Sequence, residues 1–333
     1  MKTAENIITE QLKIPPFFRL IAAEIQEAEA FLGEQLQGEN EIIAEAALSL
    51  LNSGGKRLRP GLLLLAGHCG SYQKETLIPM AAAVEMIHMA SLIHDDIVDD
   101  TPLRRGKPTA AKAYGKATAL YTGNVMLAKA LRAVLAQDDP AIRKIALTTA
   151  TEMCRGEFDQ QQAIQNNDLT KSGYLKRIRR KTANLMAAAC EIGARAGGAT
   201  EKDIAAMTAF GENLGMAFQI TDDILDYIAD ESAFGKATGS DIREGLATIP
   251  LICAAENTGE KETLSRLLKQ SRKSKAAAAE LLRRVNAEEG TTKAAALAGK
   301  YLEKAKAALK DLSREEVKNA CLELADFIEK RRR

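Results

Sequence analysis

Residues 91–100 read SLIHDDIVDD and place four aspartates behind an apolar run, at Asp95, Asp96, Asp99 and Asp100. Positions i and i+4 of a helix lie on one face, so Asp95 and Asp99 are predicted to point the same way, with Asp96 about 100° round the axis. Carboxylates at a helix C-terminus oppose the helix dipole, which favours cations there. This concentration of charge therefore indicates a ligand, and Asp100, outside the helical spacing, is predicted to be a supporting or solvated residue.

The pattern recurs in QITDDILDY, where Asp222, Asp223 and Asp226 follow a second apolar helix with the same spacing. One such cluster is also compatible with a solvated helix end, but two make surface charge a poor explanation. Mg²⁺ takes oxygen ligands, keeps several waters and is usually completed by substrate phosphates. The two clusters therefore predict a diphosphate held between two carboxylate faces by Mg²⁺.

Composition favours an all-α protein and argues against nucleic-acid binding. The 333 residues are rich in alanine and 46% hydrophobic, while 46 basic and 45 acidic residues leave a net charge of +1. Nucleic-acid binding is typically accompanied by a clear basic excess, and low aromatic content (4%, without Trp) does not favour base stacking. The five cysteines form no C-x-x-C pair and are expected to be reduced thiols. We expect no signal peptide and no transmembrane segment, and hence a cytoplasmic protein.

The chain is expected to form a single domain over residues 1–333, because no Ser/Pro-rich or low-complexity linker divides it. Gly-rich breaks at 52–60 and 233–245 and a loop at 101–110 separate the helices, and Pro60 suits a first helical turn. The motifs fall within about 45–255, and 256–333 are expected to form solvated helices. Helices are predicted at 19–52 (two), 78–100, 114–136, 139–165, 171–197 and 201–230.

Basic residues beside both clusters could bind the diphosphate. Arginine binds phosphate oxygens through two donors, and glycine allows close approach of the backbone. Each basic loop alone could equally be a solvated surface, but basic Gly-containing loops follow both acidic helices. The candidates are Lys56, Arg57, Arg59, Arg104, Arg105 and Lys236.

Polar residues on the same helices complete the predicted site. His88 lies seven residues before Asp95 and hence on the same helical stripe. It could donate a hydrogen bond to a diphosphate or be a satisfied core histidine, and the lack of a nearby His/Cys partner argues against zinc. Lys181 and Thr182 lead into an apolar run, and Gln219 lies one turn before Asp223.

In order and spacing, these segments resemble the trans-isoprenyl diphosphate synthases, or polyprenyl synthetases, most closely the hexaprenyl and heptaprenyl enzymes. The resemblance is carried by GGKRLRP, HMASLIHDDIVDD, LRRGKPT, RRKTANL, MAFQITDDILDY and GKATGSDIREG. It implies an all-α isoprenoid synthase fold, with roughly ten core helices around a deep central cavity. It also implies condensation of isopentenyl diphosphate onto an allylic diphosphate, with two or three Mg²⁺ ions. A homodimer is expected, although some relatives act only with a small second subunit.

The resemblance assigns a role to each candidate. Asp95, Asp99, Lys181, Asp222 and Lys236 are implied to be catalytic. The implied metal ligands are Asp95, Asp96, Asp99, Asp222, Asp223 and Asp226. The implied isopentenyl site is Lys56, Arg59, His88 and Arg105, and the implied allylic diphosphate contacts are Arg104, Lys181, Thr182, Gln219 and Lys236.

Product length is expected to be set near the first cluster. Short-chain relatives often carry an aromatic residue four or five positions before it, where this chain has Ser91 and Ala90. Both are small, which favours a medium or long product for a quinone side chain, with a geranylgeranyl synthase as the alternative. The stop could lie among Met126, Leu127, Met153 and Phe158, which could equally be ordinary core.

The chain departs from the family pattern at two positions, and two other classes of protein are alternatives to a synthase. Asn124 and Leu246 stand where many relatives have Asp and Lys, although neither belongs to an acidic cluster. A terpene cyclase is disfavoured by the second Asp-Asp-x-x-Asp cluster and the few aromatics. A non-catalytic partner subunit would be expected to have lost aspartates or basic contacts.

Overall fold

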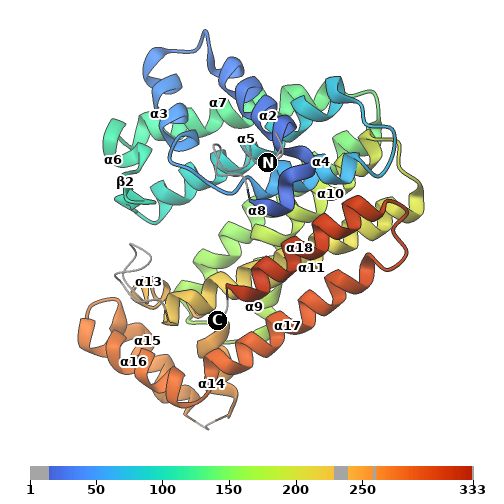
Figure 1. The fold of residues 1–333 in the computed structure, drawn as a ribbon. Helices are drawn as coiled ribbons and strands as arrows, with labels where there is room; N and C mark the ends of the chain where they lie inside the picture. Colours follow the sequence, from blue (N-terminus) through green and yellow to red (C-terminus); the bar gives the residue numbers. More distant parts are fainter. Residues whose placement is uncertain (1–14, 229–238, 258–259, 332–333) are drawn as a thin grey trace, which may run out of the picture. The chain divides into compact units, whose positions relative to one another are not determined.

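The computed structural model describes residues 15–228, 239–257 and 260–331, and these are mainly helical (Figure 1). The all-α prediction is therefore confirmed. Within these ranges the strands are β1 (Leu103–Arg104) and β2 (Lys107–Pro108), which pair as an antiparallel hairpin. The segment predicted as a plain loop thus folds back on itself, a pairing that its two prolines and one glycine did not reveal.

The chain divides into two compact units. Unit 1 comprises Met1–Thr151, Leu185–Gly211 and Ala308–Leu324, and unit 2 comprises Glu152–Asn184, Glu212–Ala307 and Ala325–Arg333. This division does not test the expectation of a single domain over residues 1–333, which stays a prediction. Four helices are divided between the units, namely α8 (Pro140–Asn166), α11 (Glu201–Ile228), α17 (Gly290–Ala308) and α18 (Glu315–Lys330), and a fifth, α10 (Asn184–Ala196), adds only its first residue to unit 2.

Unit 1 is organised around one long helix, α5 (Lys74–Val98), which packs against α2, α4 and α7 (Figure 1). Every residue of α4 except the half-buried Arg59 is buried, and Pro60 lies in its first turn as expected. Glycine lets α10 approach α4 closely, because a Cβ on Gly193 would lie 2.0 Å from the Leu63 carbonyl oxygen. The other elements are η1 (Pro16–Ile21), α2 (Ala22–Leu36), α3 (Glu41–Leu51), α4 (Leu58–Gly67), α6 (Ala110–Tyr114), α7 (Lys116–Leu135) and α10 (Asn184–Ala196).

Unit 2 has a separate apolar core, to which Tyr174, Ile220, Ile252 and Leu281 belong. Its elements include a π-helical turn, η2 (Arg179–Ala183), where the predicted helix over 171–197 widens. A short helix also interrupts the Gly-rich segment that was predicted as a loop. The elements are α9 (Lys171–Ile178), η2, α13 (Ser240–Glu244), α14 (Ile249–Asn257), α15 (Lys261–Ser271) and α16 (Lys275–Ala287), with parts of the four shared helices.

Several helices begin where the sequence supplies an oxygen for the unpaired N–H groups of the first turn. Asn40 accepts from Ile42 N at the start of α3, and Thr170 accepts from Gly173 N at the start of α9. Ser274 accepts from Ala277 N at the start of α16. The Thr170 cap explains why α9 begins at residue 171, the predicted position.

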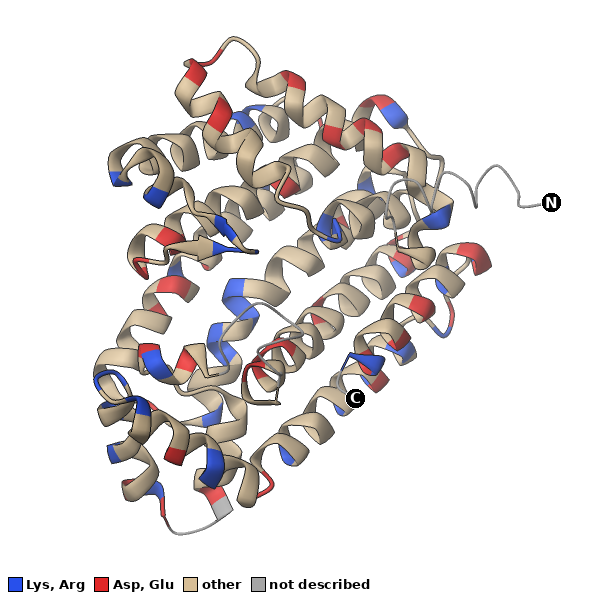
Figure 2. Ribbon diagram, turned by 60° about the vertical axis from the view of Figure 1, so that its left-hand side comes forward, with Lys and Arg blue, Asp and Glu red and all other residues tan. Residues whose placement is uncertain are grey.

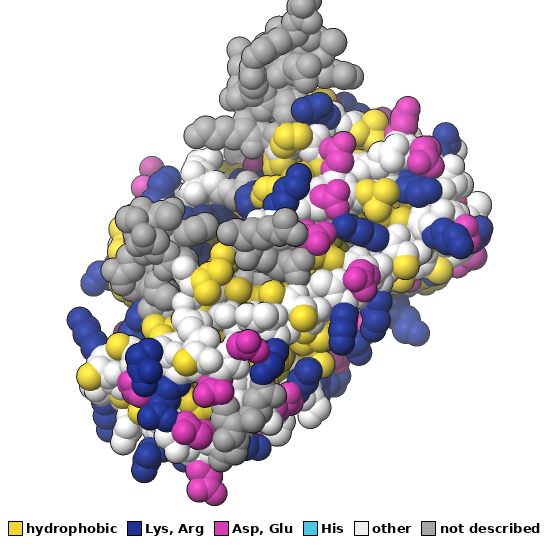
Figure 3. Space-filling model, turned by 60° about the horizontal axis from the view of Figure 1, so that its bottom comes forward, with side chains coloured by type: hydrophobic (Ala, Val, Ile, Leu, Met, Phe, Trp, Pro, Cys, Tyr) yellow, Lys and Arg dark blue, Asp and Glu magenta, His cyan; other side chains and the backbone are white. Residues whose placement is uncertain are grey.

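The expectation that no apolar stretch is long enough to cross a bilayer is wrong for α5. By length and composition alone this 25-residue helix could do so, but 72% of its most apolar window is buried inside the structure. Core helices show the same combination, because apolar residues on all sides suit a helix surrounded by protein. On the face shown in Figure 3, basic and acidic side chains are interspersed, in keeping with the net charge of +1.

Candidate functional site: two acidic clusters and a ring of arginines

The first acidic cluster ends α5 in unit 1. The helix runs to Val98, and Asp99 N–H donates to the Asp95 carbonyl oxygen at 2.9 Å, so helical geometry continues through Asp99. Asp95 and Asp99 are half-buried and follow one another by one turn. Asp100 takes the left-handed conformation, is exposed, and pairs with Lys116 at 2.7 Å. This is the supporting, solvated role expected of Asp100.

Asp96 is buried and bound by an arginine rather than presented to solvent. Its two carboxylate oxygens each accept from Arg104 Nε at 3.0 Å, and Oδ1 also accepts from Arg104 NH2 at 2.7 Å. A bidentate pair of this kind is among the stronger protein hydrogen-bonding arrangements. The hairpin that carries Arg104 is thereby held against α5, and Asp96 and Arg104 are engaged with each other (Figure 2 shows the basic residues of the hairpin).

Four guanidinium groups act on His88, two turns before the first cluster. The pKa of His88 lies well below its usual value, chiefly because the imidazole is buried and further because of Arg59, Arg105, Arg104 and Arg57, in that order. The histidine is therefore neutral near pH 7. The two basic loops converge at this point in unit 1, as a phosphate site requires.

Arg57 and Gly55 shape this ring of arginines. Arg57 lies in the left-handed region, contacts Glu29, and donates to Glu85 at 3.3 Å and to the Leu51 carbonyl oxygen at 2.7 Å. A Cβ on Gly55 would lie 3.0 Å from a guanidinium nitrogen of both Arg57 and Arg105. The glycine thus leaves room for two cations side by side. Lys56, between these residues, is exposed.

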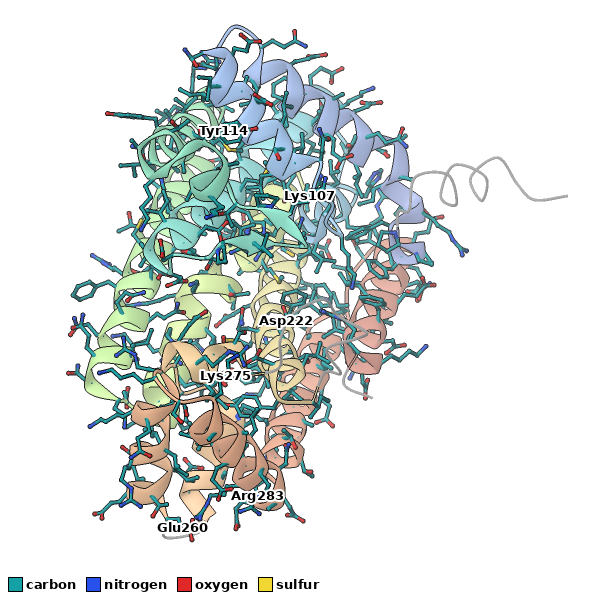
Figure 4. The ribbon with its side chains drawn as sticks, turned by 90° about the vertical axis from the view of Figure 1, so that its left-hand side faces the viewer. Lys107, Tyr114, Asp222, Glu260, Lys275 and Arg283 are labelled. Carbon is teal, nitrogen blue, oxygen red and sulfur yellow. The ribbon has the colours of Figure 1, made fainter. Side chains whose placement is uncertain are left out.

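A pocket of about 380 Å³, open to solvent, lies beside the Asp96–Arg104 pair. It is formed within unit 1 by α3, α5, the hairpin and α6, and Lys107 and Tyr114 both line it (Figure 4). Its polar lining residues include Ser49 and Ser53. The sequence did not indicate this pocket, because it depends on how the hairpin packs.

The second acidic cluster lies on α11 in unit 2, and two of its aspartates are tied to distant parts of the chain. Arg331, after the end of α18, reaches Asp222 Oδ1 at 3.1 Å (Figure 4 labels Asp222), with its guanidinium over the Phe218 ring at 5.4 Å. Asp226 accepts from Ser240 N at 3.0 Å, Ser240 Oγ at 2.8 Å and Asp241 N at 3.1 Å. Asp226 thereby anchors the start of α13.

Asp223 is the buried member of that cluster. Its Oδ2 accepts from the Tyr174 hydroxyl at 2.6 Å, and its Oδ1 accepts from Gln219 Nε2 at 2.8 Å. Gln219 Oε1 in turn accepts from the Thr182 hydroxyl at 2.7 Å. Burial, above all, raises the pKa of Asp223 to about 7, against the lowering effect of these hydrogen bonds. The structure thus joins three of the predicted site residues, Thr182, Gln219 and Asp223.

Lys181 lies in the π-helical turn beside Thr182. Its ammonium group contacts Glu157 Oε2 at 2.5 Å and Gln160 Oε1 at 3.2 Å, both on α8. Lys236, the other predicted cation of this region, lies outside the described residues.

The donor set of the clusters fits an open magnesium site. Within the described ranges no group of three His, Cys, Asp or Glu side chains is already gathered as a closed metal site. Mg²⁺ does not need one, since it commonly takes one or two carboxylates and completes its shell with water and phosphate. Each unit holds half-buried carboxylates that could supply such ligands: Asp95 and Asp99 in unit 1, and Asp222 and Asp226 in unit 2.

The positions predicted to control product length are placed as follows. Ala90 is buried on α5, and Ser91 is half-buried, with its hydroxyl donating to the His88 carbonyl oxygen at 2.8 Å. Met126 on α7 is fully buried, whereas Phe158 on α8 is 64% exposed. Phe158 is therefore not a core residue of the described structure.

Comparison with known proteins identifies the family. A family model described as "Polyprenyl synthetase" matches residues 40–285. Heptaprenyl diphosphate synthase component 2 of Geobacillus stearothermophilus is 37% identical, over 96% of this chain and 99% of the relative. A polyprenyl synthase of Caulobacter crescentus CB15, solved with calcium and isoprenyl diphosphate, is 34% identical with a TM-score of 0.88, over 95% of this chain and 97% of that chain. A geranylgeranyl pyrophosphate synthase of Lactobacillus brevis is 29% identical with a TM-score of 0.87, over 97% and 99%.

The chain therefore belongs to the polyprenyl synthetase family, as its two acidic clusters had predicted. It is an all-trans-polyprenyl diphosphate synthase, a prenyltransferase of isoprenoid biosynthesis.

Proposed function

We propose that this chain uses Mg²⁺ to condense isopentenyl diphosphate repeatedly onto an allylic diphosphate such as farnesyl diphosphate. The observation that carries the proposal is that the guanidinium groups of Arg57 and Arg105 lie side by side at Gly55, with Arg57 bonded to the helix that ends in Asp95 and Asp99. Neighbouring guanidinium groups suit the diphosphate of the isopentenyl substrate. The neighbouring carboxylates suit magnesium, and magnesium would neutralise the charge that develops on a leaving diphosphate.

The residues of this chain would divide the work between binding and positioning. Lys56, Arg59, His88 and Arg105 are proposed to hold the isopentenyl diphosphate. Asp95, Asp99 and Asp222 are the proposed ligands of two or three Mg²⁺ ions. Asp96, Asp223 and Asp226 stay predicted ligands. In the structure Asp96 is bound by Arg104, Asp223 by Tyr174 and Gln219, and Asp226 by the start of α13. Arg104, Lys181, Thr182, Gln219 and Lys236 are proposed to contact the allylic diphosphate.

We propose a medium or long product, of hexaprenyl or heptaprenyl length, for a quinone side chain such as that of menaquinone. Ala90 and Ser91 are small, and the two first relatives are named heptaprenyl diphosphate synthase component 2. A geranylgeranyl synthase is the second candidate, because structural neighbours carry that name. The names of the relatives also support a heteromer, in which this chain elongates only with a small partner.

The deciding experiment incubates the purified chain with labelled isopentenyl diphosphate, farnesyl diphosphate and Mg²⁺, and sizes the dephosphorylated products by chromatography. A hexaprenyl or heptaprenyl product that disappears with chelator supports the proposal. Products that stop at geranylgeranyl would support the second candidate. Elongation only after a candidate small subunit is added would support the heteromer, and no elongation under either condition would refute the proposed function.

We also expect a cytoplasmic homodimer. Its support is the exposed apolar side chains of α7: Leu120 and Tyr121 near its start are 46% and 62% exposed, and Leu135 at its end is 56% exposed. Large exposed apolar side chains are candidates for burial in an interface. Sedimentation equilibrium tests this expectation, with Tyr121→Arg predicted to shift the chain towards monomer; a wild-type chain that sediments only as a monomer would contradict it.

A further inference from the structure

Helix α11 has two chemically different polar faces. Asp222 and Asp226 share one face at the i, i+4 spacing, whereas Gln219, Asp223 and Tyr227 follow one another on the adjacent face at the same spacing. The second face is turned into unit 2, where Asp223 and Tyr227 are 5% and 3% exposed. The second face therefore fixes the helix in the core at Asp223 and Tyr227, while the half-buried Gln219 on the same face can still serve a ligand.

Asp223 is held from both sides. One carboxylate oxygen accepts from Tyr174 on α9, and the other accepts from Gln219 on α11 itself. A buried carboxylate gives up such hydrogen bonds only at considerable cost, so its orientation is fixed. Tyr174 is equally constrained, since it is 1% exposed and its ring has the Arg177 guanidinium 5.4 Å from its centre.

The fixed carboxylate determines the orientation of the next two polar groups. Asp223 accepts from the amide nitrogen of Gln219, so the amide oxygen of Gln219 must point the other way, towards Thr182. The Thr182 hydroxyl therefore donates its hydrogen bond to Gln219. This bond holds the π-helical turn, which carries Lys181 and Thr182, against α11. A single tyrosine hydroxyl thus stands at the start of a directed chain of hydrogen bonds.

We propose that Tyr174 is a positioning residue of the synthase: through Asp223 it orients Gln219 and Thr182 for the allylic diphosphate and its metal. This inference rests on the proposed function of the same site. Tyr174 touches neither reacting atoms nor predicted substrate, so its effect should appear in allylic diphosphate and Mg²⁺ affinity, and not in isopentenyl diphosphate affinity. Loss of a group that orients a ligand typically weakens metal affinity by about 10- to 100-fold.

The test compares Tyr174→Phe with Tyr227→Phe. Both tyrosines are buried in unit 2 and each uses its hydroxyl in one hydrogen bond, but Tyr227 meets Thr248, at 3.1 Å, instead of the carboxylate. For Tyr174→Phe we expect the KM for farnesyl diphosphate and the half-saturating Mg²⁺ concentration each to rise about tenfold, with an unchanged KM for isopentenyl diphosphate. For Tyr227→Phe we expect a lower melting temperature and wild-type values of all three constants.

Calorimetric binding of inorganic pyrophosphate in the presence of Mg²⁺ gives a second measure that does not depend on turnover. If wild-type protein fails to elongate, the proposed function fails, while weaker pyrophosphate binding by Tyr174→Phe would still support the positioning role. Wild-type pyrophosphate affinity in Tyr174→Phe, or equal losses in the two tyrosine variants, would overturn the inference.

Discussion

The surroundings of His88 disfavour its charged form. Burial and four neighbouring arginines hold its pKa well below 6.5, so the folded chain resists taking up a proton there. The unfolded chain accepts that proton below about pH 6.5, and the free energy of unfolding should therefore fall as the pH is lowered from 7 to 5. The slope for one proton is at most about 1.4 kcal/mol per pH unit.

Urea denaturation of the ligand-free chain at several pH values measures this slope. His88→Gln should flatten it, because glutamine does not titrate. A variant slope equal to that of the wild type would show that other groups cause the loss of stability in acid.

Gly55 determines how closely two guanidinium groups can approach one backbone position. Gly55→Ala should displace Arg57 and Arg105, since the new methyl group would lie 3.0 Å from both, and should raise the KM for isopentenyl diphosphate several-fold. Gly54→Ala is the control: both glycines have positive φ, but a Cβ on Gly54 meets nothing within 4 Å. Steady-state kinetics that show equal effects in the two variants would assign the change to backbone strain instead.

For single residues, the sequence predicted which side chains share a helical face, but not which side chains form hydrogen bonds with one another. The i, i+4 relation of Asp95 and Asp99 follows from helical spacing alone. The partner of Asp96 could not be predicted, because Arg104 reaches it only through the hairpin. Tyr174 was overlooked for the same reason, as nothing in the local sequence distinguishes it from an ordinary core tyrosine.

Among the elements, α5 and α7 meet where a glycine accommodates a histidine. A Cβ on Gly123 would lie 2.4 Å from His94 Nε2. Gly123→Ala should therefore destabilise the chain by about 1–3 kcal/mol, as overpacking does, and lower activity, because His94 directly precedes Asp95. Thermal unfolding measures the first effect. Gly33→Ala in α2, which meets nothing within 4 Å, should instead stabilise by up to about 1 kcal/mol, and destabilisation of similar size in both variants would contradict the steric explanation.

The end of α18 supplies a cation to the second acidic cluster. Arg331 pairs with Asp222, so a metal ion bound by that carboxylate would compete with the arginine for it. Arg331→Gln should therefore lower the half-saturating Mg²⁺ concentration for pyrophosphate binding by a few-fold, measured by calorimetry. Lys330→Gln is the control for the lost charge. An increased Mg²⁺ requirement in Arg331→Gln would show that the arginine supports the ligand rather than competing for Asp222.

Helices were predicted well because glycine and proline mark their ends. The break at 52–60 separates α3 from α4 and the break at 101–110 follows α5, as expected, whereas the short helix α6 was not predicted. The hairpin and the π-helical turn escaped prediction, because both depend on hydrogen-bond register and not on composition. The terminal residues EKRRR, predicted to be only a solvated helix end, include the arginine that reaches Asp222.

At the scale of the whole molecule, we expect the residues just before the first acidic cluster to influence the length of the product. Ala90 is 2% exposed, so a large ring there must project into neighbouring space. Ala90→Tyr should shorten the product by one or more isoprene units, as measured by chromatography of the dephosphorylated chains. Ser91→Ala is the control and should leave the product length unchanged. An unaltered product from a folded Ala90→Tyr protein would place the stop elsewhere.

The family could be predicted from the sequence, because it depends on two acidic clusters and their basic neighbours. The product could not, because it depends on which buried side chains end the hydrocarbon path, and Met126 has the same apolar character whether or not it does so. Partner choice has the same difficulty. The exposed apolar residues of α7 do not distinguish a second copy of the chain from a different subunit as the partner.

The π-helical turn has a consequence for how the length of this segment can vary. In it, Asn184 N–H donates to the Arg179 carbonyl oxygen, five residues back instead of four. Deleting one residue would close an ordinary helical turn and leave the helices on either side in their present orientation, because the extra residue is taken up within the turn; the residues inside the turn, Thr182 among them, would shift. Thr182 would then leave Gln219. An insertion or deletion here changes which side chain faces the ligand even when the helix itself survives, so the number of residues between Ile178 and Asn184 matters as much as their identity.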